Sequence, residues 1–413
     1  MTGTPTRFRE AEARGRAIAR PLLLLTGTDR AVDPALMARL ADGLLEGDAL
    51  GDRVAAALRL RPGDPDRVTH AQVAAALASP TDLADDVPPA LAAYVSALAE
   101  VPEWVDWTRV DRGAAAFQRL GTNANDVLLH LSLIGGYRFG GPTDLLVLTG
   151  ALKGDGTLRR LAETQKWSIE ATRPGGLRPG AEGWRLTAHV RVMHAMINAL
   201  FGSQWDTDRF GLPINQADLA GTLGLFDATV ILGVRALGVP LSRQERDDMM
   251  HLWRYVGWLM GVSPDLLTDD EAERHRINYH VLLAAAAQTQ AGRDLARASV
   301  DAQAERHFGH PNALVERLHG AYARERTLSV LTAFVGVRGM RDLHLPPRPP
   351  WAVAASLVRN SVRYRLVGRV RGRRWLQSQG ALAQGRVLAS SFGALEHRVG
   401  SLPDASVSGD VAA

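Results

Sequence analysis

The chain has 413 residues, a formal net charge of +4 and no cysteine. The lack of cysteine excludes a disulfide scaffold, Cys-ligated zinc, an iron–sulfur cluster, a thiolate-ligated haem and a Cys nucleophile. Only Lys153 and Lys166 are lysines among 48 basic residues, which excludes a Lys-rich tail, and the net charge is too small to indicate a nucleic-acid partner.

Apolar residues recur at helical spacing along the chain, and strand-like alternation is scarce. Leu36, Leu40 and Leu44 lie four residues apart, and Asp33-Pro34 supplies a cap followed by a proline in the first turn. We therefore expect an all-α protein. The further expected helices cover residues 113–134, 157–170, 185–202, 217–237, 243–261, 278–291 and 312–335.

Loops rich in proline and glycine divide the chain, as at Gly140-Gly141-Pro142 and at Pro346-Pro347. The expected regions are an N-terminal helical region (1–98), a core (99–343) and a basic C-terminal extension (344–413) that is disordered from about Pro403, all within one structural unit. The run Leu22 to Leu25 is too short to span a bilayer, so no transmembrane segment is expected. We expect a cytoplasmic monomer, or a secreted protein if a leader is missing or cryptic.

Histidines are the natural candidates for a metal or cofactor site, because cysteine is absent. The sequence has no His-Glu-x-x-His motif. His189 and His194 are five residues apart, as are His275 and His280, and this spacing places the two rings about 140° apart around a helix. A site built from several histidines is therefore not supported.

His194 is better interpreted as a single axial ligand of a haem. Val190, Ile197 and Phe201 lie at helical spacing around it, so the imidazole projects from an apolar face. The alternative is a core histidine bonded to a backbone carbonyl, and the pattern alone favours that alternative. His130 lies in an equally apolar segment and is the main rival as ligand.

The preceding helix carries a polar stripe formed by Arg160, Glu163, Thr164 and Trp167 at i, i+3, i+4 and i+7. A solvated Arg–Glu pair beside a half-buried tryptophan is the commoner explanation of such a stripe. The functional interpretation is a polar wall that faces a cofactor, with Arg160 and Thr164 as hydrogen-bond donors.

These residues resemble a known family. Arg160-x-x-x-Thr164, with His194 thirty residues after Thr164, is similar to the triad of the latex-clearing proteins, or rubber oxygenases. The segments 211–218 (GLPINQAD) and 253–262 (WRYVGWLMGV) resemble the same family and the wider superfamily that includes an oxygenase of mycophenolic acid synthesis.

The resemblance implies a globin-like helical core with added N- and C-terminal helices around one non-covalent haem b. It implies that His194 is the proximal iron ligand and that Arg160 and Thr164 complete the shared triad, with Arg160 also contacting the cofactor. The implied activity is dioxygen-dependent cleavage of the double bonds of poly(cis-1,4-isoprene) to oligomers with aldehyde and ketone ends.

This chain departs from the family beside Thr164. Well-known rubber-cleaving members have a lysine at that position, which can cap the iron, whereas this chain has Glu163. The family's carboxylate, thought to act as a base, corresponds to Asp144. Either Glu163 or Asp144 is therefore expected to serve as the base. Lys166 lies about 200° around the helix from Thr164 and is not a substitute.

Two functions remain open from the sequence. One is a haem dioxygenase of polyisoprene or a related lipid; the other is an intracellular haem protein that oxidises a smaller terpenoid or lipid, or that binds haem without catalysis. Asn215, Gln216 and Asp218 are expected to cap a helix, and His251 is expected to be a core residue or a packing partner of Trp258. The arginines between 359 and 374 are expected to form a solvated basic helix, with an anionic surface as the alternative.

Overall fold

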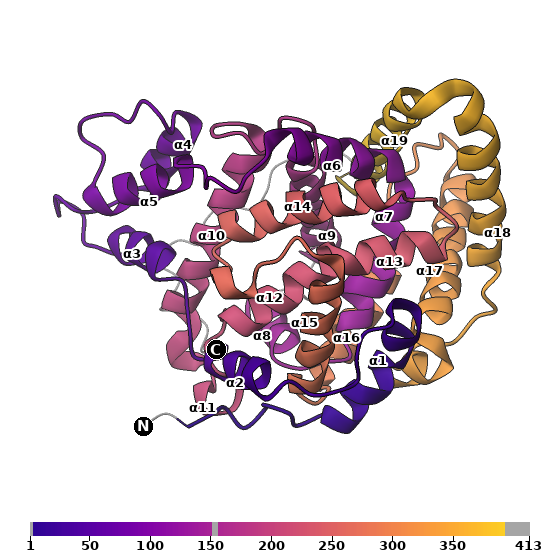
Figure 1. The fold of residues 1–413 in the computed structure, drawn as a ribbon, viewed down its shortest axis with the longest axis horizontal. Helices are drawn as coiled ribbons and strands as arrows, with labels where there is room; N and C mark the ends of the chain where they lie inside the picture. The colour runs from indigo at the N-terminus through magenta and orange to yellow at the C-terminus, as the bar shows by residue number, and fades with distance from the viewer. Residues whose placement is uncertain (1–2, 151–155, 393–413) are drawn as a thin grey trace.

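The computed structural model describes residues 3–150 and 156–392, and the regular structure within those ranges is entirely helical (Figure 1). The expected all-α class is confirmed, whereas the globin-like core and the three-region division stay predictions. The N-terminal helices are α1 (Glu12–Thr26), α2 (Pro34–Gly43), α3 (Ala49–Leu58), α4 (His70–Ala78) and α5 (Pro89–Ala99). The expected disordered end lies outside the described residues.

The middle of the chain forms the bulk of the molecule, and α18 and α19 lie at the opposite end of its long axis from α3, α4 and α5 (Figure 1). The middle elements are α6 (Trp107–Leu120), α7 (Thr122–Asp126), η1 (Val127–Ile134), α8 (Pro142–Leu148), α9 (Gly156–Ala171), α10 (Glu182–Phe201), η2 (Gly202–Gln204), α11 (Thr207–Phe210), α12 (Gln216–Phe226), α13 (Ala228–Ala236), α14 (Arg243–Leu259), η3 (Pro264–Leu266), α15 (Glu271–Ala284), α16 (Gln290–Asp301) and α17 (Ala313–Asp342). The C-terminal elements are α18 (Trp351–Asn360), η4 (Ser361–Val367) and α19 (Gly368–Phe392).

Local capping explains where several helices begin. The Asp33 carboxylate accepts hydrogen bonds from the backbone N–H groups of Ala35 and Leu36, as the sequence predicts. Asn215 likewise caps α12 by accepting from the N–H of Asp218, so the capping interpretation is confirmed for Asn215. Satisfying these free N–H groups stabilises a helix terminus by about 1 kcal/mol per cap. The side chains of Gln216 and Asp218 bond to other segments instead, to Gly47 and Gly261 and to Arg7 respectively.

Three expected helices differ from the observed ones. The stretch 113–134 is interrupted at Gly121, which adopts a positive φ of 58°. The stretch 217–237 breaks at Asp227. The prediction of one continuous helix over 278–291 is wrong, since α15 ends at Ala284 and α16 begins at Gln290.

Tertiary hydrogen bonds account for the last difference. The run of four alanines from Ala284 has high helix propensity, yet its carbonyls accept hydrogen bonds from other segments. The N–H of Arg9 bonds to the carbonyl of Ala284, and that of Gly140 bonds to the carbonyl of Ala287. These contacts outweigh the small propensity gain of a continued helix.

Within residues 3–150 and 156–392 one helical segment, Gln216–Ala236, is long and apolar enough to cross a membrane by length and composition alone. It contains the break between α12 and α13, where Asp227 forms an ion pair of 2.9 Å with Arg274 and both side chains are almost fully buried. Over half of the segment is buried inside the protein. We therefore interpret it as part of the protein core.

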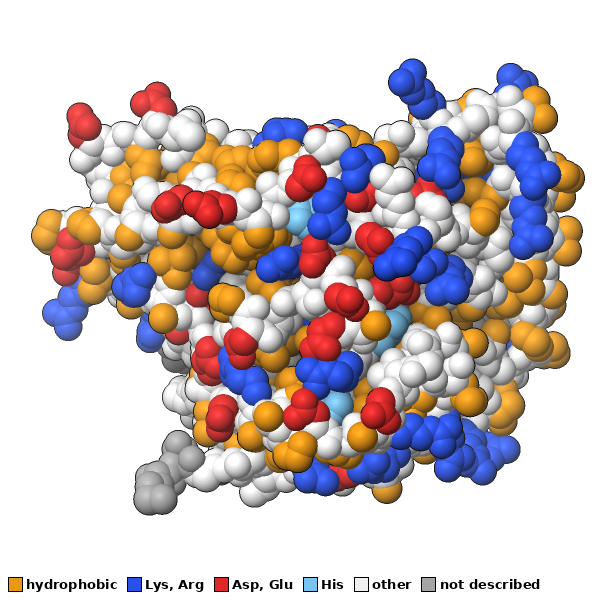
Figure 2. All heavy atoms as spheres, in the orientation of Figure 1, with side chains coloured by type: hydrophobic (Ala, Val, Ile, Leu, Met, Phe, Trp, Pro, Cys, Tyr) orange, Lys and Arg blue, Asp and Glu red, His pale blue; other side chains and the backbone are white. Residues whose placement is uncertain are grey.

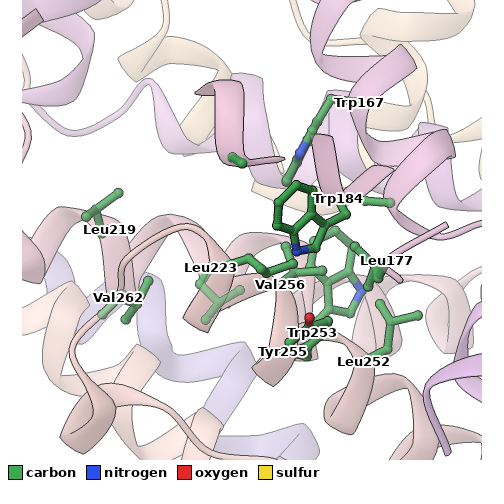
Figure 3. Close-up of a cluster of buried hydrophobic side chains, with 14 of the residues drawn as sticks. Trp167, Leu177, Trp184, Leu219, Leu223, Leu252, Trp253, Tyr255, Val256 and Val262 are labelled. Carbon is green, nitrogen blue, oxygen red and sulfur yellow. The ribbon is translucent and has the colours of Figure 1, made fainter. Parts of the chain in front are cut away.

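The main core spans most of the chain, from Leu36 to Leu376. Part of it is the cluster of buried side chains around Trp167, Trp184 and Trp253, from α9, α10 and α14 respectively (Figure 3). Close helix packing supports this core: a Cβ added to Gly113 of α6 would come within 2.3 Å of the carbonyl oxygen of Asp248 on α14. The core therefore fixes α9, α10 and α14 relative to one another, and these helices carry the candidate site.

Candidate active site

The site is built on the antiparallel pair formed by α9 and α10. Gly183 lets the two helices approach closely, because a Cβ at this position would lie 2.4 Å from the carbonyl oxygen of Glu170. The indole N–H of Trp167 donates to the hydroxyl of Thr187 at 3.0 Å and fixes the register of the pair.

That register places Arg160 and His194, the first and last residues of the triad, at the same height along the two helices. Arg160 precedes Trp167 by seven residues and His194 follows Thr187 by seven, so each lies about 10.5 Å along its helix from the Trp167–Thr187 bond. Seven residues are also nearly two full turns, so each side chain keeps the face of its reference residue. The packing of α9 on α10 thus brings Arg160 and His194 to one side of the pair.

A large cavity lies along this side, with a volume of about 1860 Å³. Ordinary small-molecule sites occupy roughly 300–1,000 Å³, so this cavity is large enough for a bulky cofactor together with a substrate. Its walls are mainly apolar. The lining includes Val190, Met193, Ile197 and Phe201 of α10, Leu219 and Leu223 of α12, and Val256 of α14.

An aromatic group closes one wall of the cavity. Trp167, Phe226 and Trp253 line it, and their ring centroids lie 5.2–6.0 Å apart. In the close-up, Trp167 and Trp253 lie on either side of Trp184, which belongs to the same core cluster (Figure 3). Such mutually packed rings make a rigid wall, since each ring is held by its neighbours.

His194 lines the cavity and its Nδ1 is buried without a hydrogen-bond partner among the described residues. The His194 side chain is half-buried where it borders the cavity. Burial lowers the pKa of His194 to about 4, because the charged form loses its hydration. The imidazole is therefore neutral near pH 7, the form in which a histidine binds a metal.

His130, the rival ligand, also lines the cavity but has both ring nitrogens engaged. Its Nδ1 lies 2.6 Å from the carbonyl oxygen of Asp126, and its Nε2 lies 3.3 Å from the hydroxyl of Thr327. Burial lowers the pKa of His130 to about 4 as well. The pKa shift is thus the same for both histidines, whereas exposure and hydrogen bonding distinguish them, since His130 is fully buried and His194 is only half-buried.

The polar stripe of α9 also borders the cavity, with Arg160, Glu163 and Thr164 all in its lining. Arg160 donates to the carbonyl oxygen of Thr149 at 2.8 Å and approaches the hydroxyl of the same residue at 3.3 Å. Burial lowers the pKa of this guanidinium, an effect that the nearby Glu163 opposes. Thr149 was not identified from the sequence; its only signal is a polar residue at the end of the apolar helix α8.

Glu163 and Asp144 have different environments. The Glu163 carboxylate pairs with Arg159 at 2.9 Å and reaches the cavity lining. The Oδ2 of Asp144 accepts from the N–H of Gly141 and the hydroxyl of Thr289, and Asp144 is not among the described residues that line the cavity. The structure therefore brings Glu163, and not Asp144, together with the triad. The base role of either residue stays a prediction.

The remaining residues of interest have structural contacts. The Nζ of Lys166 lies 3.8 Å from the Oε1 of Glu182, as an ion pair. His251 is buried, as expected, but its partners are Asp269 and the backbone N–H of Asp106, whereas Trp258 stacks on Tyr255. Among the described residues no group of three or more histidines and carboxylates could hold a metal ion.

A further ion pair supports the helix of His194 and was missed from the sequence. Arg191 donates to both carboxylate oxygens of Asp48, at 2.6 and 2.8 Å, and thereby ties α10 to the start of α3. The Gln216 side chain donates to the carbonyl oxygens of Gly47 and Gly261 in the same area. Arg191 also donates to the carbonyl oxygen of Leu259, and the side chain of Asn198 on α10 bonds to the backbone of Ile214, so both long motifs support α10.

The comparisons with known proteins agree with this arrangement. The model of the family "ER-bound oxygenase mpaB/B'/Rubber oxygenase, catalytic domain" matches residues 124–370. The solved structure of the latex clearing protein LCP in its closed state matches with a TM-score of 0.60 and 18% identity, over 87% of this chain and 93% of that one. A comparison with curated proteins gives no significant match. The chain belongs to the family of the ER-bound mpaB-type oxygenases and the rubber oxygenases, and it has the fold of latex clearing protein.

Proposed function

We propose that this protein is a haem b-dependent dioxygenase that cleaves the double bonds of poly(cis-1,4-isoprene). The observation that carries the proposal is His194: a neutral imidazole without a protein partner at Nδ1, on an apolar helix face that borders a cavity of about 1860 Å³. Membership of the rubber oxygenase family supports the same assignment.

The residues present fit a haem held by a single axial ligand. His194 would ligate the iron, and the apolar residues of α10 and α12 would pack against the macrocycle. When bound, the haem supplies the iron that binds and activates dioxygen. Arg160 is held by Thr149 and is available as a cationic hydrogen-bond donor at the polar wall, either to a propionate or to an oxygen atom.

Thr164 and Glu163 supply the remaining polar groups. The Thr164 hydroxyl can donate a hydrogen bond at the cavity surface, next to the Glu163 carboxylate. In the proposed reaction Glu163 removes and later returns an allylic proton of the alkene. The overall change adds one dioxygen across one carbon–carbon double bond, so both oxygen atoms end in the aldehyde and ketone products and no external reductant is consumed.

The apolar walls determine what can react. Leu219, Leu223 and the rings of Trp167, Phe226 and Trp253 present no charge to a hydrocarbon chain, so an alkene can lie along them without a desolvation cost.

A second candidate is the oxidation of a smaller terpenoid or lipid by the same haem. It is favoured by Glu163, which replaces the lysine that the sequence resemblance leads one to expect beside Thr164. A carboxylate cannot act as a neutral amine ligand, so the distal chemistry need not be that of the well-known rubber-cleaving members. A haem-binding protein without catalysis is the remaining alternative.

Oxygen consumption by the haem-loaded protein in a polyisoprene emulsion separates these candidates. Polymer cleavage predicts steady oxygen uptake together with products that carry aldehyde and ketone groups. Oxygen uptake only with short terpenoids would support the second candidate. A haem spectrum without uptake on any alkene would overturn both catalytic assignments.

A further inference from the structure

The helical segment from α18 through η4 into α19 has an unusual distribution of polarity. One row of side chains at four-residue spacing is buried: Ala352, Ser356, Asn360 and Tyr364. Another row at the same spacing is exposed: Val358, Val362, Leu366 and Val370. The rows are offset by two residues, about 200° around the helix, so they lie on opposite faces. The exposed row is thus more apolar than the buried one.

Hydrogen bonds fix which face is buried. The Asn360 side-chain amide donates to the side chain of Asn123 and to the carbonyl oxygen of Leu237, both at 2.8 Å. The Tyr364 hydroxyl donates to the carbonyl oxygen of Arg119 at 2.8 Å. Rotating the helix to bury the valines would leave these buried groups unpaired, at a large cost for each. The exposure of the apolar row is therefore a fixed property of the fold.

Arginines flank the exposed row on both sides. Between residues 343 and 395 the sequence contains nine arginines and no acidic residue. The exposed ones, each one position before or after a member of the exposed row, are Arg359, Arg365, Arg369 and Arg371, whereas Arg363 is half-buried with its Nε and Nη2 inside the protein. Within the described part of the chain none of these four exposed arginines forms an ion pair. Blue and orange spheres accordingly alternate along the edge that α18 and α19 form (Figure 2).

The same face adjoins an end of the cavity. Arg359, Arg386 and Tyr322 are exposed and also belong to the cavity lining. Tyr322 lies next to Trp351 at the start of α18, with ring centroids 5.7 Å apart. The exposed apolar row, its arginines and this end of the cavity thus form one continuous area, here called the C-terminal face.

We propose that the C-terminal face binds the surface of a membrane that contains anionic phospholipids. The exposed valines and Leu366 would enter the interface between head groups and acyl chains, and the flanking arginines would contact the lipid phosphates. An apolar stripe with basic residues on its borders and an aromatic residue at its end is the composition of a helix that lies in a membrane surface. Charge alone would suit a nucleic acid equally well, but a nucleic acid offers no place for four exposed aliphatic side chains.

The docked orientation has a consequence for the cavity. Because Tyr322 and Arg359 belong to both the face and the cavity lining, docking places that end of the cavity at the lipid. An apolar substrate could then enter from the acyl-chain region without crossing water. This consequence depends on the proposed function, whereas the membrane binding itself does not.

Sedimentation with vesicles tests the binding directly on the full chain. The probes are vesicles of phosphatidylcholine alone and vesicles with 30% phosphatidylglycerol, at low and high salt. One variant combines Val358→Ser, Leu366→Ser and Val370→Ser, with Leu24→Ser/Leu25→Ser as its control, because these leucines are the most exposed ones elsewhere. A second combines Arg365→Gln, Arg369→Gln and Arg371→Gln, with Arg20→Gln/Arg53→Gln/Arg59→Gln as its control.

We expect the protein to bind the anionic vesicles and to be released by salt. Each arginine near a charged membrane surface contributes about fivefold in affinity, so the arginine variant should bind about 100-fold more weakly, while its control keeps most of the binding. The serine variant should lose binding even at low salt. All variants change exposed residues, and circular dichroism checks that they are folded.

Three results would overturn the proposal. One is equal binding to neutral and anionic vesicles, or to neither. The second is that the protein binds DNA as tightly as it binds anionic vesicles and that the serine variant keeps this DNA binding, which would indicate a polyanion site. The third is adsorption to polyisoprene emulsion with no response to lipid charge. Activity is not measured in this experiment, so a failure of the proposed function would leave its result unchanged.

Discussion

The low pKa of His194 makes a quantitative prediction about haem binding in acid. A histidine must lose its proton to ligate iron, so protons compete with the metal. With a pKa of about 4, only about a tenth of the His194 rings carry a proton at pH 5, whereas an ordinary histidine with a pKa of 6.5 would be almost fully protonated. Lowering the pH from 7 to 5 should therefore weaken haem affinity about 1.1-fold, against about 25-fold for an ordinary histidine.

The assay is a titration of the haem-free protein with haem, followed in the Soret band at pH 7 and pH 5. Far-ultraviolet circular dichroism at both pH values shows whether the protein is folded. His130→Gln serves as the matched control, because His130 has the same low pKa but both its nitrogens are engaged. A loss of affinity near 25-fold in a folded protein would contradict the low pKa of the iron ligand, since it would mean that this ligand titrates like a solvated histidine.

Three further predictions concern the base, the acid stability and the buried ion pair. Glu163→Gln should lower kcat for alkene cleavage by at least about 100-fold with an unchanged Soret band; an unaltered kcat would exclude Glu163 as the base. The folded-state pKa of His130 is depressed from 6.5 to about 4, so its contribution to stability is present above pH 6.5 and is lost as the pH falls towards 4. Urea unfolding should accordingly show that the free energy of unfolding falls by about 2 kcal/mol more in the wild type than in His130→Gln between pH 7 and pH 5, and equal losses would contradict this. Asp227→Ala should cost about 3–5 kcal/mol because it leaves Arg274 charged and buried, whereas the double variant Asp227→Leu/Arg274→Met should recover most of the loss; chemical denaturation measures both.

The helices of the site could be predicted well from the sequence, because their signals are local. The expected ranges 157–170 and 185–202 correspond to α9 (Gly156–Ala171) and α10 (Glu182–Phe201). Apolar periodicity and the glycine- and proline-rich loop between the two helices carry that information. The same is true of the caps, since Asp33 and Asn215 act on N–H groups within three residues of themselves.

Features that depend on distant segments could not be predicted in the same way. Nothing near Ala285 indicates that its neighbours bond to the N-terminal segment, and nothing near Arg191 indicates Asp48 as its partner. The two cavity histidines illustrate the same limit. Their local patterns are alike, but the Nδ1 of His130 is bonded to the carbonyl oxygen of Asp126 whereas that of His194 is unpaired among the described residues, and the Nε2 of His130 contacts Thr327, 197 residues away.

The inverted polarity of α18 has the same origin. The sequence shows a basic segment and predicts a solvated helix, because periodicity reveals that a helix has two faces but not which one is buried. The choice is made by Asn360 and Tyr364, whose partners lie on other helices. The exposure of the valine row is thus a tertiary property.

The absorption spectrum of His194→Gly shows whether His194 ligates the iron. The purified wild type should bind one haem b with a histidine-ligated Soret band, and His194→Gly should lose or shift this band. Added imidazole should restore it by occupying the space left by the side chain. His130→Gln should keep the wild-type spectrum. Full haem retention with an unchanged spectrum in His194→Gly would contradict the assignment of His194 as the iron ligand.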